Sequence, residues 1–356
     1  MINEKDRLGR LLFLEFDRKK AAEIFLAETL REETGELYVP INPDFLIQKI
    51  QNDEVPKDLP VSEFIIGMAY ALALDPDFSY APMYRAMLKG FPDTEAILKG
   101  RAARLFSDQK QVEGYILSKG LYEVTGDMET ENVLLSVGEE LALNDPEWMG
   151  EVLSLTELAC ANKNLNAYLI KGSLERAQGN EKEALLALEE HVLQGGEKTA
   201  ELTAVMEELD RNSRAEEAYA ILYDEPAEAL KVFLELLPRE SANVRLIYSI
   251  AVAYRILGNH EKAILYLEDA EKVDPGYMDV QNEMGLNYAL LEDYGTATGY
   301  FRAVYEATQE LAPLTNLIIS LLNLNREEEA MVLYEKAVEM DPEDEILSEI
   351  RRIYLP

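Results

Sequence analysis

Few residues of this sequence could carry acid–base, nucleophilic or metal chemistry together. The 356-residue chain has two histidines, His191 and His260, and one cysteine, Cys160. Neither histidine has a second histidine or a cysteine close to it, so no set with the spacing of a zinc site is present. The sequence also lacks H-E-x-x-H, paired C-x-x-C, G-x-S-x-G and G-x-x-x-x-G-K-[ST] patterns. We therefore expect a protein that is not an enzyme and binds no metal or cofactor.

The negative charge of the chain limits the classes of molecule that we expect it to bind. It has 68 Asp and Glu against 34 Lys and Arg, a formal net charge of −34. Nucleic acids and anionic lipids attract proteins through Lys and Arg, so we expect neither as a partner. No uninterrupted apolar run is long enough to cross a membrane, and the lone Cys160 excludes an intramolecular disulfide. The expected location is the cytoplasm.

Stretches with apolar residues at helical spacing, separated by turns, recur along the sequence. The helices that they predict must position any functional surface of the protein. The clearest unit spans 243–275, where one stripe runs through Ala251 and a second through Ala263, with a turn at 258–260 between them. Two antiparallel helices can approach closely where both have small residues at the crossing. Pro275 then ends the second helix, because proline lacks the N–H that helix propagation needs.

This unit resembles the tetratricopeptide repeat (TPR), a helix–turn–helix of about 34 residues. The position of Ala251 recurs at similar intervals, at Gly9, Gly67, Gly100, Gly138, Gly172, Met206, Gly285 and Ile318. Most of these are followed, twelve residues later, by a second small residue such as Ala184, Ala218, Ala297 or Ala330. The resemblance is to acidic TPR solenoid proteins of bacterial type. It implies an all-α fold, a right-handed superhelical solenoid of about nine TPR or TPR-like repeats with a C-terminal capping helix.

The repeats differ in how closely they follow the pattern. Residues 1–160 read as degenerate TPR-like helical repeats with an inserted loop at about 38–60. Residues 161–356 form a clearer array, which has an extra helix at about 226–237 and the capping helix at 345–354. These two ranges are the expected domains.

In TPR proteins the first helices of successive repeats line a concave face that binds peptides or partner proteins. If this chain follows the same arrangement, the inner positions of each repeat can be counted from the small residue at the helix crossing, such as Ala251. They lie six and three residues before it and one and four residues after it. Arginine occurs at these positions and lysine does not. The candidate partner-binding residues are Arg101, Arg104, Asn166, Arg176, Arg245, Tyr248, Arg255 and Asn282.

Arginine suits bidentate capture of carboxylates, so this groove is expected to hold an acidic or carboxylate-bearing peptide. The competing interpretation is that each arginine pairs with an acid on a neighbouring helix. Lysine is also absent from the places where chaperone-binding TPR proteins carry their carboxylate clamp, which disfavours that role. We expect a non-catalytic scaffold or adaptor for protein–protein interaction. Two alternatives stay open: a peptide-responsive signalling regulator of the Gram-positive TPR type, and a self-assembling solenoid that forms homo-oligomers.

Overall fold

A computed structural model describes the chain outside residues 1–10, 32–34, 43–44, 46–58 and 355–356. The chain divides into two compact units, Met1–Leu209 and Asp210–Pro356, which we call unit 1 and unit 2. Their boundary falls inside one helix, α12 (Ala200–Ile221). The division expected between residues 160 and 161 rests on the clarity of the repeat pattern and stays a prediction. Most described residues are helical, and within each unit successive helices pack in pairs, so the fold is an all-α solenoid.

Unit 1 begins with a small β-hairpin where the sequence predicts a helical repeat. Strand β1 (Leu12–Phe16) pairs antiparallel with β2 (Leu37–Ile41), and Leu14 lies opposite Val39. Aromatic and branched apolar residues on both segments favour such cross-strand pairs. Helix α2 (Arg18–Ile24) and a 3₁₀ helix (Glu28–Arg31) connect the strands.

The expectation of a TPR-like helix at the start of the chain is therefore wrong for Leu12–Phe16, and part of the expected loop at 38–60 is strand. The crossing residue Gly9 and most of the expected loop fall on residues that the structure does not describe. The hairpin packs tightly on helix α4 (Val61–Leu74): a Cβ added to Gly67 would lie only 2.2 Å from the carbonyl oxygen of Pro40.

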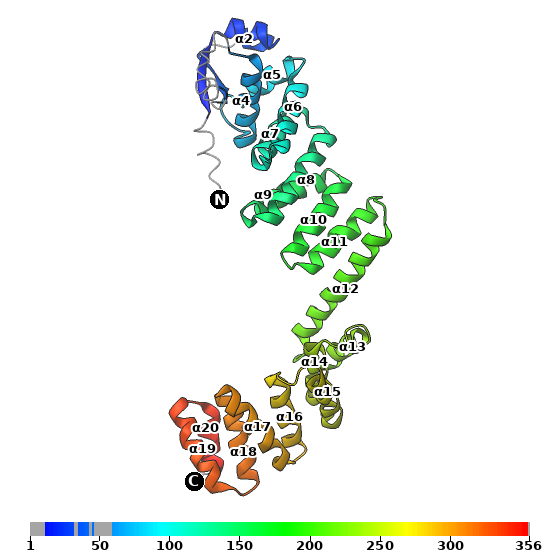
Figure 1. Cartoon of the computed structure of the whole chain (residues 1–356), viewed down its shortest axis with the longest axis vertical. Coiled ribbons are helices and arrows are strands. Elements are labelled where there is room, and N and C mark those ends of the chain that lie inside the picture. The colour runs from blue at the N-terminus through cyan, green and yellow to red at the C-terminus, as the bar shows by residue number, and fades with distance from the viewer. Residues whose placement is uncertain (1–10, 32–34, 43–44, 46–58, 355–356) are drawn as a thin grey trace. The chain divides into compact units, whose positions relative to one another are not determined.

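The remainder of unit 1 is helical, and its core joins each helix to the next along the chain. Its helices are α4 (Val61–Leu74), α5 (Ala81–Gly90), α6 (Thr94–Ser107), α7 (Gln111–Thr125), α8 (Met128–Asn144), α9 (Met149–Ala161), α10 (Leu165–Ala177), α11 (Glu181–Leu193) and the first half of α12 (Figure 1).

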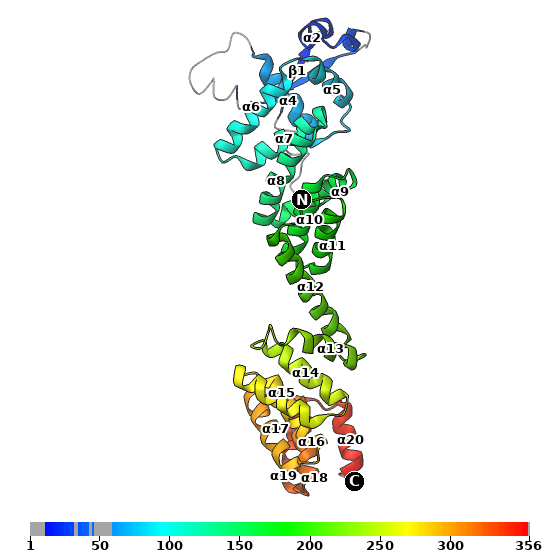
Figure 2. The ribbon, with the colours of Figure 1, turned by 90° about the vertical axis from the view of Figure 1, so that its right-hand side faces the viewer.

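Unit 2 contains the second half of α12 and eight further helices among its described residues. They are α13 (Pro226–Leu236), α14 (Val244–Ile256), α15 (His260–Val273), α16 (Met278–Leu290), α17 (Tyr294–Thr308), α18 (Leu311–Asn323), α19 (Glu327–Met340) and α20 (Glu345–Tyr354) (Figure 2). Helix α13 lies where the sequence suggests an extra helix. Helix α20 buries Leu347 and Ile350 against the last pair, which confirms the capping helix.

Small residues at the helix crossings allow the pairs to pack as the sequence predicts. Ala251 and Ala263 are fully buried where α14 crosses α15. At the next crossing, a Cβ on Gly285 would lie 2.6 Å from the ring of Phe301. Tyrosines three residues after each crossing extend the contact, because Tyr254 and Tyr288 each stack on a tyrosine of the second helix.

A left-handed residue closes the first helix of the regular pairs. Gly179, Gly258, Glu292 and Asn325 all have φ between 56° and 80° and stand seven residues after the crossing position. The equivalent residue of the unit around Met206 is Ser213, which is helical. Helix α12 therefore continues without a turn, and the second helix expected to contain Ala218 is not separate from the first.

Candidate functional site

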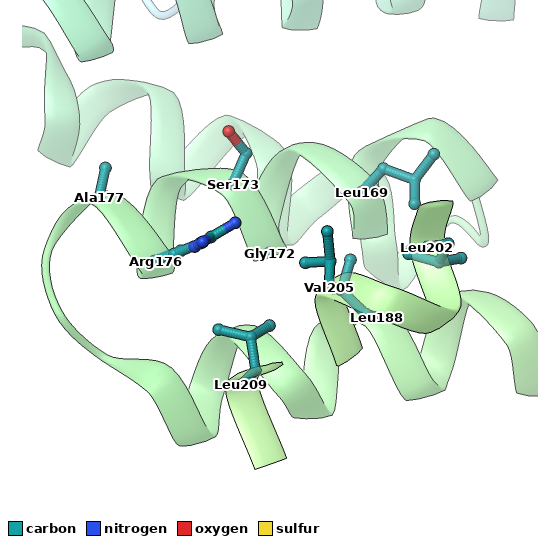
Figure 3. Close-up of a pocket in the computed structure, with 9 residues that line it drawn as sticks. All are labelled: Leu169, Gly172, Ser173, Arg176, Ala177, Leu188, Leu202, Val205 and Leu209. Carbon is teal, nitrogen blue, oxygen red and sulfur yellow. The ribbon is translucent and has the colours of Figure 1, made fainter. Parts of the chain in front are cut away.

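Side chains at the inner positions of α10 border a pocket within unit 1. The pocket has a volume of about 520 Å³. Helix α10 contributes Leu169, Gly172, Ser173, Arg176 and Ala177, as Figure 3 shows. Leu188 of α11 and Leu202, Val205 and Leu209 of α12 complete its lining. Three of these residues, Leu169, Ser173 and Arg176, occupy inner positions of the repeat.

Several side chains around the pocket are smaller than those at the corresponding positions of unit 2. The corresponding positions of unit 2 hold Tyr248 and Val252 on α14, where α10 has Leu169 and Ser173. They hold Met284 and Tyr288 on α16, where α12 has Val205 and Leu209. Val252 and Met284 are fully or almost fully buried in unit 2.

Two polar side chains are the exceptions in this aliphatic lining. Arg176 donates a 2.8 Å hydrogen bond to Glu208 of α12, and both side chains remain more than 40% exposed. Ser173 lies one residue after the crossing glycine, and Figure 3 shows its hydroxyl directed away from the Arg176 guanidinium. An ion pair as exposed as this one contributes only about 0–1 kcal/mol. Arg176 can therefore exchange Glu208 for another anion at little cost.

Unit 2 carries an aromatic inner patch, which we define as Tyr219, Arg245, Tyr248, Tyr277 and Asn282. The guanidinium of Arg245 lies 3.8 Å from the ring centroid of Tyr219. Tyr248 and Tyr277 meet edge to face, with their ring centroids 5.9 Å apart. Burial raises the pKa of Tyr248, Tyr219 and Tyr277, so all three hydroxyls are neutral near pH 7.

The charged group of this patch is held loosely. Arg245 is 56% exposed and reaches Glu216 of α12 over 3.1 Å. The carbonyl oxygen of Asn282 is shielded from solvent and has no hydrogen-bond partner among the described residues. Half-buried tyrosines beside an exposed arginine are the residue types that contribute most at protein interfaces.

Arg255 is held differently, in a buried polar network. Its guanidinium pairs with Glu283 of α16, whose side chain is only 4% exposed. Burial raises the pKa of Glu283, and Arg255 acts in the opposite direction. Asn287 donates to the backbone oxygen of Glu283 over 2.8 Å, and His260 lies 3.3 Å from the amide oxygen of Asn287. Arg255 therefore serves the packing of α14 on α16.

The predicted arginines thus fall into two groups. Arg176, Arg245 and Arg255 each pair with an acid on a neighbouring helix, as the competing interpretation holds. Arg101 and Arg104 have no ion pair within the described part of the chain, and Arg104 is exposed. Asn166 is exposed at the start of α10. Whether these residues bind a partner stays a prediction.

Sequence reasoning missed Tyr219, Tyr277 and the pocket. The two tyrosines lie outside the four inner positions of each repeat, and a cavity depends on which side chains oppose each other. No group of three His, Cys, Asp or Glu side chains in the described ranges could hold a metal ion. Likewise, no helix in those ranges is long and apolar enough to span a bilayer.

Comparison with known proteins supports the repeat pattern. The family model described as "Tetratricopeptide repeat" matches residues 244–277 and 320–344. No curated protein sequence gives a match. Among solved structures, a thermophilic TPR protein of Thermus thermophilus is similar over 54% of this chain and 99% of its own, with 23% identity and a TM-score of 0.37.

Two further structures are similar to the same extent. YrrB, a TPR protein with an unusual peptide-binding site, matches over 56% of this chain and 97% of its own, with 18% identity and a TM-score of 0.40. The C-terminal part of a TPR repeat-containing protein from Cytophaga hutchinsonii matches over 70% and 97%, with 13% identity and a TM-score of 0.40. Similarity at this level implies nothing about a shared ligand.

Proposed function

We propose that this chain, whose second unit matches the tetratricopeptide-repeat family model at 244–277 and 320–344, is a non-catalytic scaffold that holds a segment of a partner protein on the inner face of its first helices. The observation that carries the proposal is the aromatic inner patch of unit 2. There an exposed arginine stacks on one tyrosine and adjoins two more. Tyrosine and arginine supply large contact areas together with directional hydrogen bonds.

The partner segment that fits this patch best contains a carboxylate. Among the described residues, Arg245 forms an ion pair with the exposed Glu216, so a partner carboxylate can replace Glu216 without leaving a buried charge unpaired. The tyrosine rings then pack against apolar parts of the segment, and Asn282 can pair with its backbone.

A displayed library of random peptides tests the proposal. Peptides are selected on the wild-type chain, and their affinities are then measured for Arg245→Glu. We expect selected peptides to be rich in Asp and Glu and to lose at least tenfold in affinity for this variant, which is about 1.4 kcal/mol. The matched control is Arg352→Glu, which makes the same charge change on the 74% exposed Arg352 of α20. Equal affinity for both variants, with unchanged thermal melting, would rule out the patch as the binding site.

A further inference from the structure

The pocket of unit 1 has a lining that suits one kind of small molecule. We propose that it binds an aliphatic monocarboxylate, with the hydrocarbon chain between α10, α11 and α12 and the carboxylate on Arg176. This site is separate from the aromatic inner patch, which belongs to unit 2. The inference goes beyond scaffolding, because it assigns a small-molecule ligand to the chain.

The size and chemistry of the pocket lead to this ligand class. A volume of about 520 Å³ falls inside the range of about 300–1,000 Å³ that is usual for small-molecule sites. Its apolar walls come from leucine, valine, alanine and glycine. Without an aromatic side chain there is no surface on which a flat ring would stack, so a flexible hydrocarbon chain is the better fit.

The polar groups of the lining match a single anionic head group. Arg176 and Ser173 are its only side chains with hydrogen-bonding groups, one a cation and one a hydroxyl, and both come from α10. Arginine binds a carboxylate through two parallel N–H···O bonds. The single cation of an otherwise largely aliphatic lining therefore matches a ligand with one carboxylate.

A peptide inserted into the pocket is disfavoured for the same reason. Each of its residues would bring a backbone N–H and a C=O group, and every such group needs a partner when it leaves water. The aliphatic walls offer none. A hydrocarbon chain carries no such groups, so its burial breaks no hydrogen bonds with water.

The state of Arg176 also favours exchange with a ligand. The equivalent arginine in unit 2, Arg255, is fixed by Glu283, which is almost completely buried and would be left unpaired by exchange. Glu208, the partner of Arg176, is 44% exposed and would return to water. The same repeat position thus holds a structural arginine in one unit and an exchangeable one in the other.

Calorimetric titration of the full chain with decanoate tests the proposal, because the two members of the ion pair should act in opposite directions. We expect saturable binding at one site. Arg176→Gln should weaken it at least tenfold, and Glu208→Gln should strengthen it severalfold by removing the competing carboxylate. Opposite effects of this kind cannot arise from a general loss of folding. The matched control, Arg214→Gln, removes a 41% exposed arginine of unit 2 that is paired with Glu235, and it should leave decanoate binding unchanged.

Two further ligands separate the sources of binding. Decan-1-ol has the chain without the charge, so it should bind more weakly than decanoate and respond little to Arg176→Gln. A short peptide that ends in leucine with a free carboxylate should not compete with decanoate. Failure of decanoate to bind, equal decanoate affinity for all variants, or displacement by the peptide would overturn the proposal. None of these results would affect the test of the inner patch, which rests on Arg245.

Discussion

The ion pair between Arg255 and Glu283 offers a sharp test of how the inner face is built. The variant Arg255→Met keeps a long apolar side chain but leaves the carboxylate of Glu283 buried without its cation. Loss of one partner of a buried pair costs about 3–5 kcal/mol. Arg255 is 23% exposed, so some water can reach the site and we expect a value near the lower end, about 3 kcal/mol.

The pH dependence of this loss follows from the pKa of Glu283. Burial raises that pKa above its ordinary value of 4.5, and removal of Arg255 raises it further. A carboxyl whose folded-state pKa is raised stabilises the fold fully below the unfolded pKa, and this contribution is lost as the pH rises through the folded pKa. The destabilisation by Arg255→Met should therefore be small near pH 5 and largest near pH 7.5.

Urea and thermal unfolding at both pH values measure the effect. A loss of about 3 kcal/mol in a domain the size of unit 2 lowers the melting temperature by about 6–12 °C. The second change Glu283→Gln should recover most of the loss, because a neutral amide has no charge to desolvate. Arg245→Met is the matched control, since it breaks an exposed pair and should cost less than about 1 kcal/mol. Equal losses for the two arginine variants, a loss independent of pH, or no recovery with Glu283→Gln would refute the reasoning.

Three more outcomes follow from packing, backbone conformation and burial. Gly285→Ala should destabilise the chain by about 1–3 kcal/mol in urea unfolding, because the added Cβ would overlap the ring of Phe301. Gly299→Ala is the control: its added Cβ meets open space, so this change should be neutral or stabilising. Equal effects of the two changes would contradict the crossing geometry. Glu292→Gly should stabilise by about 1 kcal/mol in the same assay because Glu292 has a φ of 63°, and a loss of stability would show that its side chain matters more than its backbone. Burial raises the pKa of Cys160 to about 11, so iodoacetamide at pH 8 should alkylate the folded chain at least tenfold more slowly than the urea-unfolded chain, as followed by mass spectrometry; equal rates would show an accessible thiolate.

The repeat architecture could be read from the sequence because its signals are local. Ala251 and Ala263, or Gly285 and Ala297, are small because two helices must cross, and that need repeats every time the motif does. Pro226 opens α13 and the apolar pattern of 345–354 predicts α20, since both signals lie within the helix that they define. Arginine at the inner positions is equally visible.

The exceptions to the architecture could not be read in this way. Leu12–Phe16 is a strand because Leu37–Ile41 pairs with it, and no local signal identifies a partner about 25 residues away. Helix α12 is continuous because Ser213 does not take the left-handed conformation that its equivalents Gly179 and Gly258 adopt. A serine is compatible with either outcome, so the packing on each half of the helix decides.

The candidate sites show the same division. The sequence by itself determined an acidic all-α repeat protein, the phase of most of its repeats, and which side chains stand at the inner positions. Tertiary structure alone decided what those side chains do. It paired Arg255 with a buried acid and Arg176 with an exposed one, placed Tyr219 under Arg245, and left a cavity beside Leu169 and Ser173. The physical reason is that charge pairing and cavity volume depend on residues from different helices, whose distances are set only when the helices pack.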